Sequence, residues 1–440
     1  MITIRKRGPE TQHFSIAARK GSYVTLKTHP MSGPLQIFIV MGILLLAQSV
    51  VSLRDGFSFL RYVRLSRSQP PGDYVPRVAL IIPAKGTDPA FEANIGAFLR
   101  QDYPQYRVTF VVDDKKDPAF AKLNALVAKA GEPGLMGSER VSVVIAGTSE
   151  TRGQKVHNLL EGLKTVDPEM EVLVFADADA RPSPSWLMSL VAPLANPQVT
   201  VSTGFRWYLP GRTFVSQLRA AWDTSIATLL GEHDASFPWG GSMALRAPDF
   251  KRLRVAEHYW QSTVSDDYSL SRAVRDAGGK IRFEPRCLVS SREDSTLGEF
   301  VRWTNRQIII TRVYAPRLWH LGLAAHLLYA GTLIYAVVLM LSSRMPVPGK
   351  FGILAFLVVI LALGMAKGKI RSTVARETFP EEREFLAEYG NRYWQLAPLV
   401  PWVMLWNFVT AGFTRRIEWR GIRYRLRSDH EVEIIGREQA

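Results

Sequence analysis

The stretch Val172-Leu173-Val174-Phe175-Ala176-Asp177-Ala178-Asp179 decides the fold class of this chain. A short apolar run, typical of a buried strand, leads directly into two carboxylates one residue apart. Similar β-branched runs recur between residues 76 and 295, and helical stretches lie between them. Strands that alternate with helices predict an α/β domain with a mainly parallel sheet. The predicted strands cover residues 78–82, 108–112, 141–145, 172–175 and 199–202, and the predicted helices cover residues 91–100, 116–130 and 155–166.

Apolar segments flank this domain on both sides. Residues 34–53 contain no charged side chain, and at about 1.5 Å of rise per residue they would form a helix about 30 Å long, enough to cross a bilayer. The segments 318–341 and 351–366 are predicted to form a helical hairpin. The segment 396–413 contains two prolines, so it either spans the membrane or forms a kinked or interfacial helix. We therefore predict an integral, multi-pass membrane protein with one N-terminal and two to three C-terminal transmembrane helices.

These patterns divide the chain into six parts. The first apolar segment has no small-residue cleavage pattern after it, so we expect a retained anchor and not a removed signal peptide. The predicted parts are a polar, basic segment at 1–33, a transmembrane helix at 34–53, a cytosolic α/β domain at 76–298, an interfacial helix at 299–317, a membrane region at 318–413 and a basic tail at 414–440.

The chain is strongly basic. It has 55 Lys and Arg residues against 40 Asp and Glu residues, a formal charge of +15. This balance favours contact with nucleic acid, acidic lipid headgroups or a phosphorylated substrate. No zinc-finger, RNA-binding or helix-turn-helix signature accompanies the charge, so we expect no nucleic-acid partner. The single cysteine, Cys287, excludes an internal disulfide.

Acidic residues follow two of the predicted strands. Asp177 and Asp179 come after the strand at 172–175, at the sheet edge where parallel sheets bind ligands. Such a pair holds a hard divalent cation that neutralises a diphosphate leaving group, or it simply forms a solvated turn with a capping Asp. Asp114 follows the strand at 108–112. It either accepts hydrogen bonds from a nucleotide or ends the strand in an ordinary turn.

Two predicted helices begin with charged residues. Lys155 opens the helix at 155–166, where it either meets nucleotide oxygens or remains an ordinary exposed lysine. Asp267 lies in the first turn of an amphipathic helix. Capping and the helix dipole explain an acidic residue there, but a general base that deprotonates an acceptor hydroxyl explains it equally well.

Arg302 and Trp303 precede the second apolar segment. Arginine can bind a diphosphate by charge-assisted hydrogen bonds, and tryptophan can form a stacking wall for an acceptor. The alternative is an amphipathic interfacial helix, in which both residues are common.

The order of these motifs resembles the family 2 type of glycosyltransferase, and more closely its ceramide glucosyltransferase group. The resemblance covers about residues 76–320. It is carried by the residues Pro83-Ala84-Lys85-Gly86-Thr87-Asp88-Pro89, Gln101-Asp102-Tyr103-Pro104-Gln105-Tyr106, Val112-Asp113-Asp114 with Asp117-Pro118-Ala119, Asp177-Ala178-Asp179, Gly240-Gly241-Ser242-Met243-Ala244-Leu245, Asp266-Asp267-Tyr268 and Arg302-Trp303.

The resemblance implies a GT-A-like domain and a hexosyltransferase that inverts the sugar configuration. The donor would be a UDP-sugar and the acceptor a lipid hydroxyl, most closely ceramide, at the cytosolic membrane face. The implied roles are nucleotide or diphosphate binding for Asp114, Lys155, Arg302 and Trp303, binding of Mg²⁺ or Mn²⁺ for Asp177 and Asp179, and general base for Asp267.

Two residues depart from the pattern of the resembled group. Glu299 stands where Gln or Arg is more usual, and a carboxylate near a diphosphate is unfavourable, so we leave it out of the binding set. Asp179 can be absent from ceramide enzymes, so its presence favours the metal and weakens the ceramide assignment. The alternatives are a processive polysaccharide synthase of the same superfamily and a non-catalytic membrane protein that binds sugar lipids.

Overall fold

The computed structural model describes residues 13–17, 23–27, 33–88, 90–129, 131, 135–233 and 235–437. Pro89 and most of the predicted basic segment at 1–33 lie outside the described residues. The chain divides into two compact units, which we describe separately. One combines residues 1–49 with 328–360, and the other combines residues 50–327 with 361–440.

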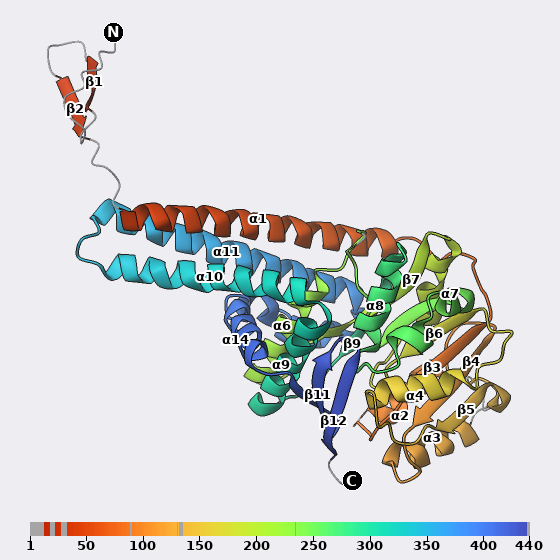
Figure 1. Cartoon of the computed structure of the whole chain (residues 1–440). Helices are drawn as coiled ribbons and strands as arrows, with labels where there is room; N and C mark the ends of the chain where they lie inside the picture. The colour runs from red at the N-terminus through yellow and green to blue at the C-terminus, as the bar shows by residue number, and fades with distance from the viewer. Residues whose placement is uncertain are drawn as a thin grey trace. The chain divides into compact units, whose positions relative to one another are not determined.

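A seven-stranded sheet forms the centre of the larger unit (Figure 1). Its strands are β3 (Val78–Pro83), β4 (Tyr106–Val112), β5 (Val141–Ile145), β6 (Val172–Ala176), β7 (Val199–Tyr208), β8 (Ser242–Arg246) and β9 (Lys280–Ser291). The strand order is β5-β4-β3-β6-β8-β7-β9. Only β8 is antiparallel to its neighbours, β6 and β7. The predicted α/β fold with a mainly parallel sheet is confirmed.

The five predicted strands are all present, but β8 and β9 were not predicted. Every side chain of β6 is buried, which explains its unbroken apolar run. β9 lies at the edge of the sheet and includes charged side chains and a proline, so its sequence carries a weaker strand pattern.

Helices cover both faces of the sheet. Val174 and its neighbour Phe175 belong to different apolar cores, because successive side chains of a strand point to opposite faces. Phe98 packs edge-on against Trp186 in one core, at 5.7 Å between ring centroids. The helices are α2 (Phe91–Phe98), α3 (Pro118–Ala128), α4 (Gln154–Leu163), α5 (Trp186–Val191), α6 (Phe214–Ala227), α7 (Ala247–Arg252) and α8 (Asp266–Asp276).

A long helix, α9 (Leu297–Tyr314), follows the sheet. Thr296 and Glu299 form a capping box at its start, in which each side chain hydrogen-bonds to the backbone N–H of the other residue. Glu299, left out of the predicted binding set, has this capping role and also lines the cavity described below. Three shorter helices come later in the chain: α12 (Arg383–Tyr389), α13 (Arg392–Gln395) and α14 (Val400–Phe413).

Three helices of the described chain are long and apolar enough to cross a membrane: α1 (Gly33–Arg67), α10 (Pro316–Leu341) and α11 (Val347–Thr378). They match one N-terminal and two C-terminal predicted spans. The fourth apolar segment forms α14, whose 14 residues reach only about 21 Å. Asn407 of α14 instead accepts a hydrogen bond from the Trp222 indole N–H of α6 at 3.0 Å.

The predicted basic tail is folded. It forms a three-stranded antiparallel sheet of β10 (Arg416–Trp419), β11 (Ile422–Ser428) and β12 (Glu431–Arg437). Tyr424 of β11 is buried, and its hydroxyl accepts a hydrogen bond from the backbone N–H of Gln154 at 3.1 Å. Apolar and basic residues alternate along β11, which is the pattern of a half-buried strand, but the segment was interpreted from its charge alone.

The smaller unit contains parts of α1, α10 and α11 and an antiparallel hairpin of β1 (His13–Ala17) and β2 (Tyr23–Lys27). Phe38 and Phe356 pack edge-on with ring centroids 5.3 Å apart. The Tyr335 hydroxyl donates to the carbonyl of Pro34 at 3.1 Å.

Candidate active site

A cavity of about 1730 Å³ lies at the carboxyl ends of β3 and β6 in the larger unit. Segments far apart in sequence line it, from the end of β3 to the C-terminal sheet. Five of the seven predicted site residues line this one cavity: Lys155, Asp177, Asp179, Asp267 and Trp303. Asp114 and Arg302 are not among the lining residues.

The pair Asp177 and Asp179 follows β6 and is held by cationic side chains. The Lys155 ammonium lies 2.8 Å from Asp177. Arg206 of β7 forms a close ion pair with Asp179, and Arg420 lies 3.7 Å from the same carboxylate. Burial would raise the pKa of Asp179, but the charges of Arg206 and Arg420 lower it to about 2. Asp179 is therefore ionised at neutral pH.

Lys155 joins two acidic segments of the site. Its ammonium lies 3.0 Å from Asp266 as well as near Asp177, and it donates to the carbonyl of Gly240 at 3.1 Å. Burial would lower the pKa of Lys155, but these carboxylates and Asp267 raise it. A Cβ at Gly240 would lie 2.5 Å from Asp266 Oδ2 and 2.6 Å from Lys155 Nζ, so a side chain there would displace the ion pair between these two residues.

Asp267 occupies the first turn of α8, behind the N-cap residue Ser265. Its carboxylate accepts hydrogen bonds from the backbone N–H of Tyr268 at 2.7 Å and of Gly240 at 3.4 Å. These bonds fix the carboxylate where it lines the cavity. Asp267 and Asp177 thus belong to the same cavity and are linked through Lys155 and Gly240.

At the end of β4 the structure distinguishes two neighbouring acidic residues. Asp114 is exposed and accepts a hydrogen bond from the backbone N–H of Lys116 at 2.8 Å. Asp113 is buried and forms an ion pair with Lys85, which lines the cavity. Asp114 was the predicted ligand, whereas the Asp113–Lys85 pair was not predicted, although both of its residues stand in the quoted motifs.

Of the two residues in the Arg-Trp motif of α9, only one lines the cavity. Arg302 is exposed and outside the cavity lining. Trp303 lines the cavity and packs edge-on against Tyr208 and Trp222, with centroid distances of 5.5 and 5.2 Å. Arg306, one helical turn later, lines the cavity in place of Arg302.

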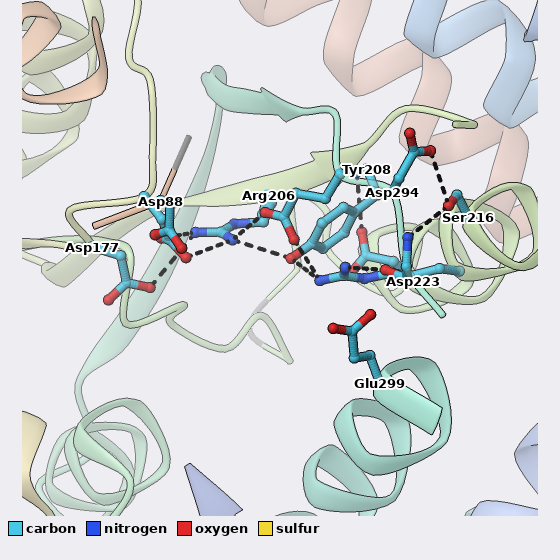
Figure 2. Close-up of polar contacts among 12 residues, drawn as sticks. Asp88, Asp177, Arg206, Tyr208, Ser216, Asp223, Asp294 and Glu299 are labelled. Carbon is cyan, nitrogen blue, oxygen red and sulfur yellow. Dashed lines mark hydrogen bonds and ion pairs between the residues drawn. The ribbon is translucent and has the colours of Figure 1, made fainter. Parts of the chain in front are cut away.

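An arginine network that was not predicted from the sequence connects the acidic pair to these aromatic rings. Figure 2 shows Arg206 between the Asp88 and Asp177 side of the network and Tyr208. Arg206 donates to the Tyr208 hydroxyl at 3.1 Å, and Arg219 of α6 donates to the same hydroxyl at 2.7 Å. No local sequence pattern predicted the roles of Arg206 and Arg219, because their partners are distant in sequence.

Asp223 of α6 is a further buried carboxylate in the cavity wall (Figure 2). It accepts a long hydrogen bond from the backbone N–H of Tyr208 at 3.5 Å. Burial raises the pKa of Asp223 to about 7, although this hydrogen bond and the charge of Arg219 act in the opposite direction. Asp223 is therefore partly protonated near neutral pH.

The predicted donor set for a divalent cation would consist of carboxylate oxygens from Asp177 and Asp179. No group of three or more His, Cys, Asp or Glu side chains is arranged around a metal position within the described residues. Hard oxygen donors on a cavity wall fit Mg²⁺ or Mn²⁺, which take substrate phosphates and water as their remaining ligands. Lys155, Arg206 and Arg420 neutralise the two carboxylates in this structure.

The cavity thus combines paired carboxylates, a lysine and a further carboxylate at the ligand-binding edge of an α/β sheet. Comparison with protein families gives the class directly. Residues 37–432 match the model of glycosyl transferase family 21. The chain belongs to this family and is a glycosyltransferase, as the sequence resemblance predicted at that level.

Solved structures with a similar chain path include two named enzymes. A mannosyltransferase from Pyrobaculum calidifontis, in complex with GDP-mannose and Mn²⁺, is 18% identical; the match covers 85% of this chain and 97% of that one, with a TM-score of 0.44. Glucosyl-3-phosphoglycerate synthase from Mycobacterium tuberculosis, in complex with Mn²⁺ and UDP-glucose, is 16% identical over 57% of this chain and 81% of that one, with a TM-score of 0.34.

Proposed function

We propose that the protein transfers one sugar from a UDP-sugar to the hydroxyl of a membrane lipid, most closely ceramide, with inversion at the anomeric carbon. The observation that carries the proposal is the shared cavity. Residues suited to bind a metal diphosphate, Asp177 and Asp179, line the same cavity as Asp267, the proposed base.

In this proposal, the polar residues of the cavity bind the diphosphate of the donor and neutralise its charge. Asp177 and Asp179 would hold Mg²⁺ or Mn²⁺, and the bound cation would offset the charge of the leaving diphosphate. Lys155 is a half-buried cation that forms ion pairs with both Asp177 and Asp266, so it fixes the position of these two carboxylates. Trp303 lines the same cavity as an aromatic surface, which we assign to the acceptor.

Asp267 performs the proton transfer in this proposal. Its carboxylate takes the proton of the acceptor hydroxyl while that oxygen forms a bond to the anomeric carbon. The bond between the anomeric carbon and the diphosphate oxygen breaks, and its electron pair leaves with the nucleoside diphosphate. Attack from the face opposite the leaving group inverts the configuration. The roles predicted for Asp114 and Arg302 stay predictions, and no step uses them.

The long apolar helices of the chain favour a lipid as the acceptor. Three helices long and apolar enough to span a bilayer accompany the catalytic domain. An enzyme retained at a membrane meets a lipid acceptor at high effective concentration. We propose that the catalytic domain faces the cytosol, where nucleotide sugars are made. The described chain has three candidate spans, which favours a single transfer over export of a growing polymer.

The proposal is tested by mass spectrometry of lipids extracted from cells that express the wild-type protein or the Asp267→Asn variant. We expect one glycolipid species, one sugar heavier than its acceptor, in the wild-type extract alone. A ladder of repeat units would favour the polysaccharide synthase. The same lipids in both extracts would favour a non-catalytic binding protein and would contradict the proposal.

A further inference from the structure

The turn between β10 and β11 carries an unusual residue. Trp419 pairs with Ile422, so Arg420 and Gly421 form a two-residue hairpin loop. Both have positive φ, 49° and 74°. Such a turn prefers Asn or Asp followed by Gly, because a longer side chain rarely adopts positive φ. An arginine in this position costs backbone strain and suggests that its side chain has a use.

Arg420 points into the site of the larger unit. Its guanidinium donates two hydrogen bonds to Asp88, at 3.0 and 2.9 Å, and lies 3.7 Å from Asp179. The C-terminal sheet is held there by the bond between Tyr424 and Gln154 and by an ion pair between Arg272 and Asp429. The turn is therefore positioned by the fold and not by Arg420 alone.

Arg306 of α9 is the neighbouring cation in the cavity wall. Its guanidinium lies 5.0 Å above the Trp419 ring and donates a long hydrogen bond to the carbonyl of Glu418 at 3.5 Å. No carboxylate forms an ion pair with Arg306 within the part of the chain that the structure describes. Burial lowers the pKa of Arg306 to about 10, and the charges of Arg420 and Arg219 act in the same direction. An anionic ligand would stabilise this cation.

We infer that Arg306 and Arg420 form a two-arginine clamp for the donor's diphosphate, so that the C-terminal sheet is part of the donor site. The inference rests on the proposed function, which supplies the nucleotide sugar. The Arg306 guanidinium lies over the Trp419 ring, and Arg420 follows Trp419 in the turn, so both cations belong to the same part of the cavity wall. A guanidinium can bind phosphate oxygens in bidentate fashion. Arg420 would exchange its hydrogen bonds with Asp88 for bonds to phosphate.

A lipid phosphate could use the same chemistry, but the position of Arg420 favours the donor. Arg420 contacts Asp88, just after β3, and Asp179, just after β6. These residues mark the carboxyl edge of the sheet, where doubly wound sheets bind nucleotide phosphates. The clamp therefore lies at the end of the cavity where the sugar nucleotide is expected.

The test compares binding of UDP and UMP to the full-length protein in lipid-free detergent by calorimetry, with GDP and GMP in parallel. Arg420→Asn removes the cation and suits the positive φ of the turn. Arg306→Gln removes the second cation, and Arg420→Lys retains a charge. Arg416→Asn is the matched control, because Arg416 is exposed on the same sheet and outside the cavity lining.

We expect the wild-type protein to bind the diphosphate more tightly than the monophosphate. Arg420→Asn and Arg306→Gln should each weaken diphosphate binding about tenfold or more and change monophosphate binding by less than about twofold. Arg420→Lys should recover part of the loss, and Arg416→Asn should match the wild type. An unchanged preference for the diphosphate in both charge-removing variants, or an equal loss for both nucleotides, would overturn the clamp. A wild-type protein without any preference for a diphosphate would contradict the proposed function itself.

Discussion

The polar and aromatic parts of the cavity wall are built in different ways. In the polar part, Asp177, Lys155 and Asp266 hold one another through ion pairs of 2.8 and 3.0 Å. In the aromatic part, Trp303 is held by edge-on ring contacts with Tyr208 and Trp222. The polar side chains neutralise each other's charges, whereas the aromatic side chains fix a shape.

The difference separates two kinds of function. Ion pairs between neighbouring side chains can exchange partners with a charged ligand, so the polar part suits a metal and a diphosphate. Packed rings change little on binding and supply apolar area, so the aromatic part suits an acceptor. Arg219 connects the parts, because its guanidinium lies 4.7 Å over the Trp303 ring and 2.9 Å from Glu293. Glu293 in turn lies 3.6 Å from Arg206, the partner of Asp179. Mutations in the two parts should therefore affect different kinetic constants.

The largest effect is expected for Asp267→Asn. The amide cannot accept the acceptor's proton, so kcat should fall by about 10²–10⁴-fold. The KM for the donor should change little, because Asp267 acts on the acceptor. Steady-state kinetics with purified protein measure both constants. Wild-type turnover in this variant would remove Asp267 from the role of base.

The next effect is the response to metal removal. Exhaustive treatment with EDTA should reduce sugar transfer more than tenfold, because Asp177 and Asp179 would lose the cation that neutralises the leaving group. Mg²⁺ or Mn²⁺ added in excess should restore it. Full transfer after chelation would show that Lys155, Arg206 and Arg420 suffice for the diphosphate.

A smaller and more selective effect is expected in the aromatic part. Trp303→Leu removes the ring contacts with Tyr208 and Trp222, so the KM for the lipid acceptor should rise several-fold, consistent with about 1 kcal/mol of lost aromatic contact. The KM for the donor should stay near its wild-type value. Tyr259→Leu is the control, because Tyr259 lies outside the cavity lining. Equal changes in both KM values would argue against separate parts.

The smallest effect concerns stability. Burial raises the pKa of Asp223 to about 7, so between about pH 4 and pH 7 the folded state binds more protons than the unfolded state. The contribution of this residue to stability therefore falls as the pH rises through that range. The Tm of the wild type should fall between pH 5 and pH 8, and the Tm of Asp223→Asn should fall less. The difference should be about 2–4 °C for each kcal/mol of unfolding free energy that the variant does not lose. An unchanged pH dependence would contradict a protonated Asp223.

Local patterns in the sequence predicted much of the fold and part of the site. Buried strands such as β6 have unbroken apolar runs, and the acidic pair that follows β6 stands out for that reason. Asp267 was identified from its place at the start of an amphipathic helix, and the structure brings it to the same cavity as Asp177.

The remaining site residues depend on contacts between distant segments. Arg420 lies 332 positions after its partner Asp88, and no local pattern relates the two. Arg302 and Arg306 lie four positions apart on one helix, and only the packing of α9 decides which of them lines the cavity. The folded C-terminal sheet was missed although Ile422, Tyr424 and Leu426 alternate with arginines, because the segment was interpreted from its charge and not from its period of two.

The central claim is that one cavity joins a nucleotide sugar to a lipid hydroxyl in a single inverting step. The most direct measurement incubates the purified full-length protein with a UDP-sugar and ceramide, and determines the mass and the anomeric configuration of the product by mass spectrometry and NMR. The account predicts ceramide carrying one sugar, with the configuration opposite to that of the donor. Retention of the donor's configuration, or addition of many sugars to one acceptor, would contradict it.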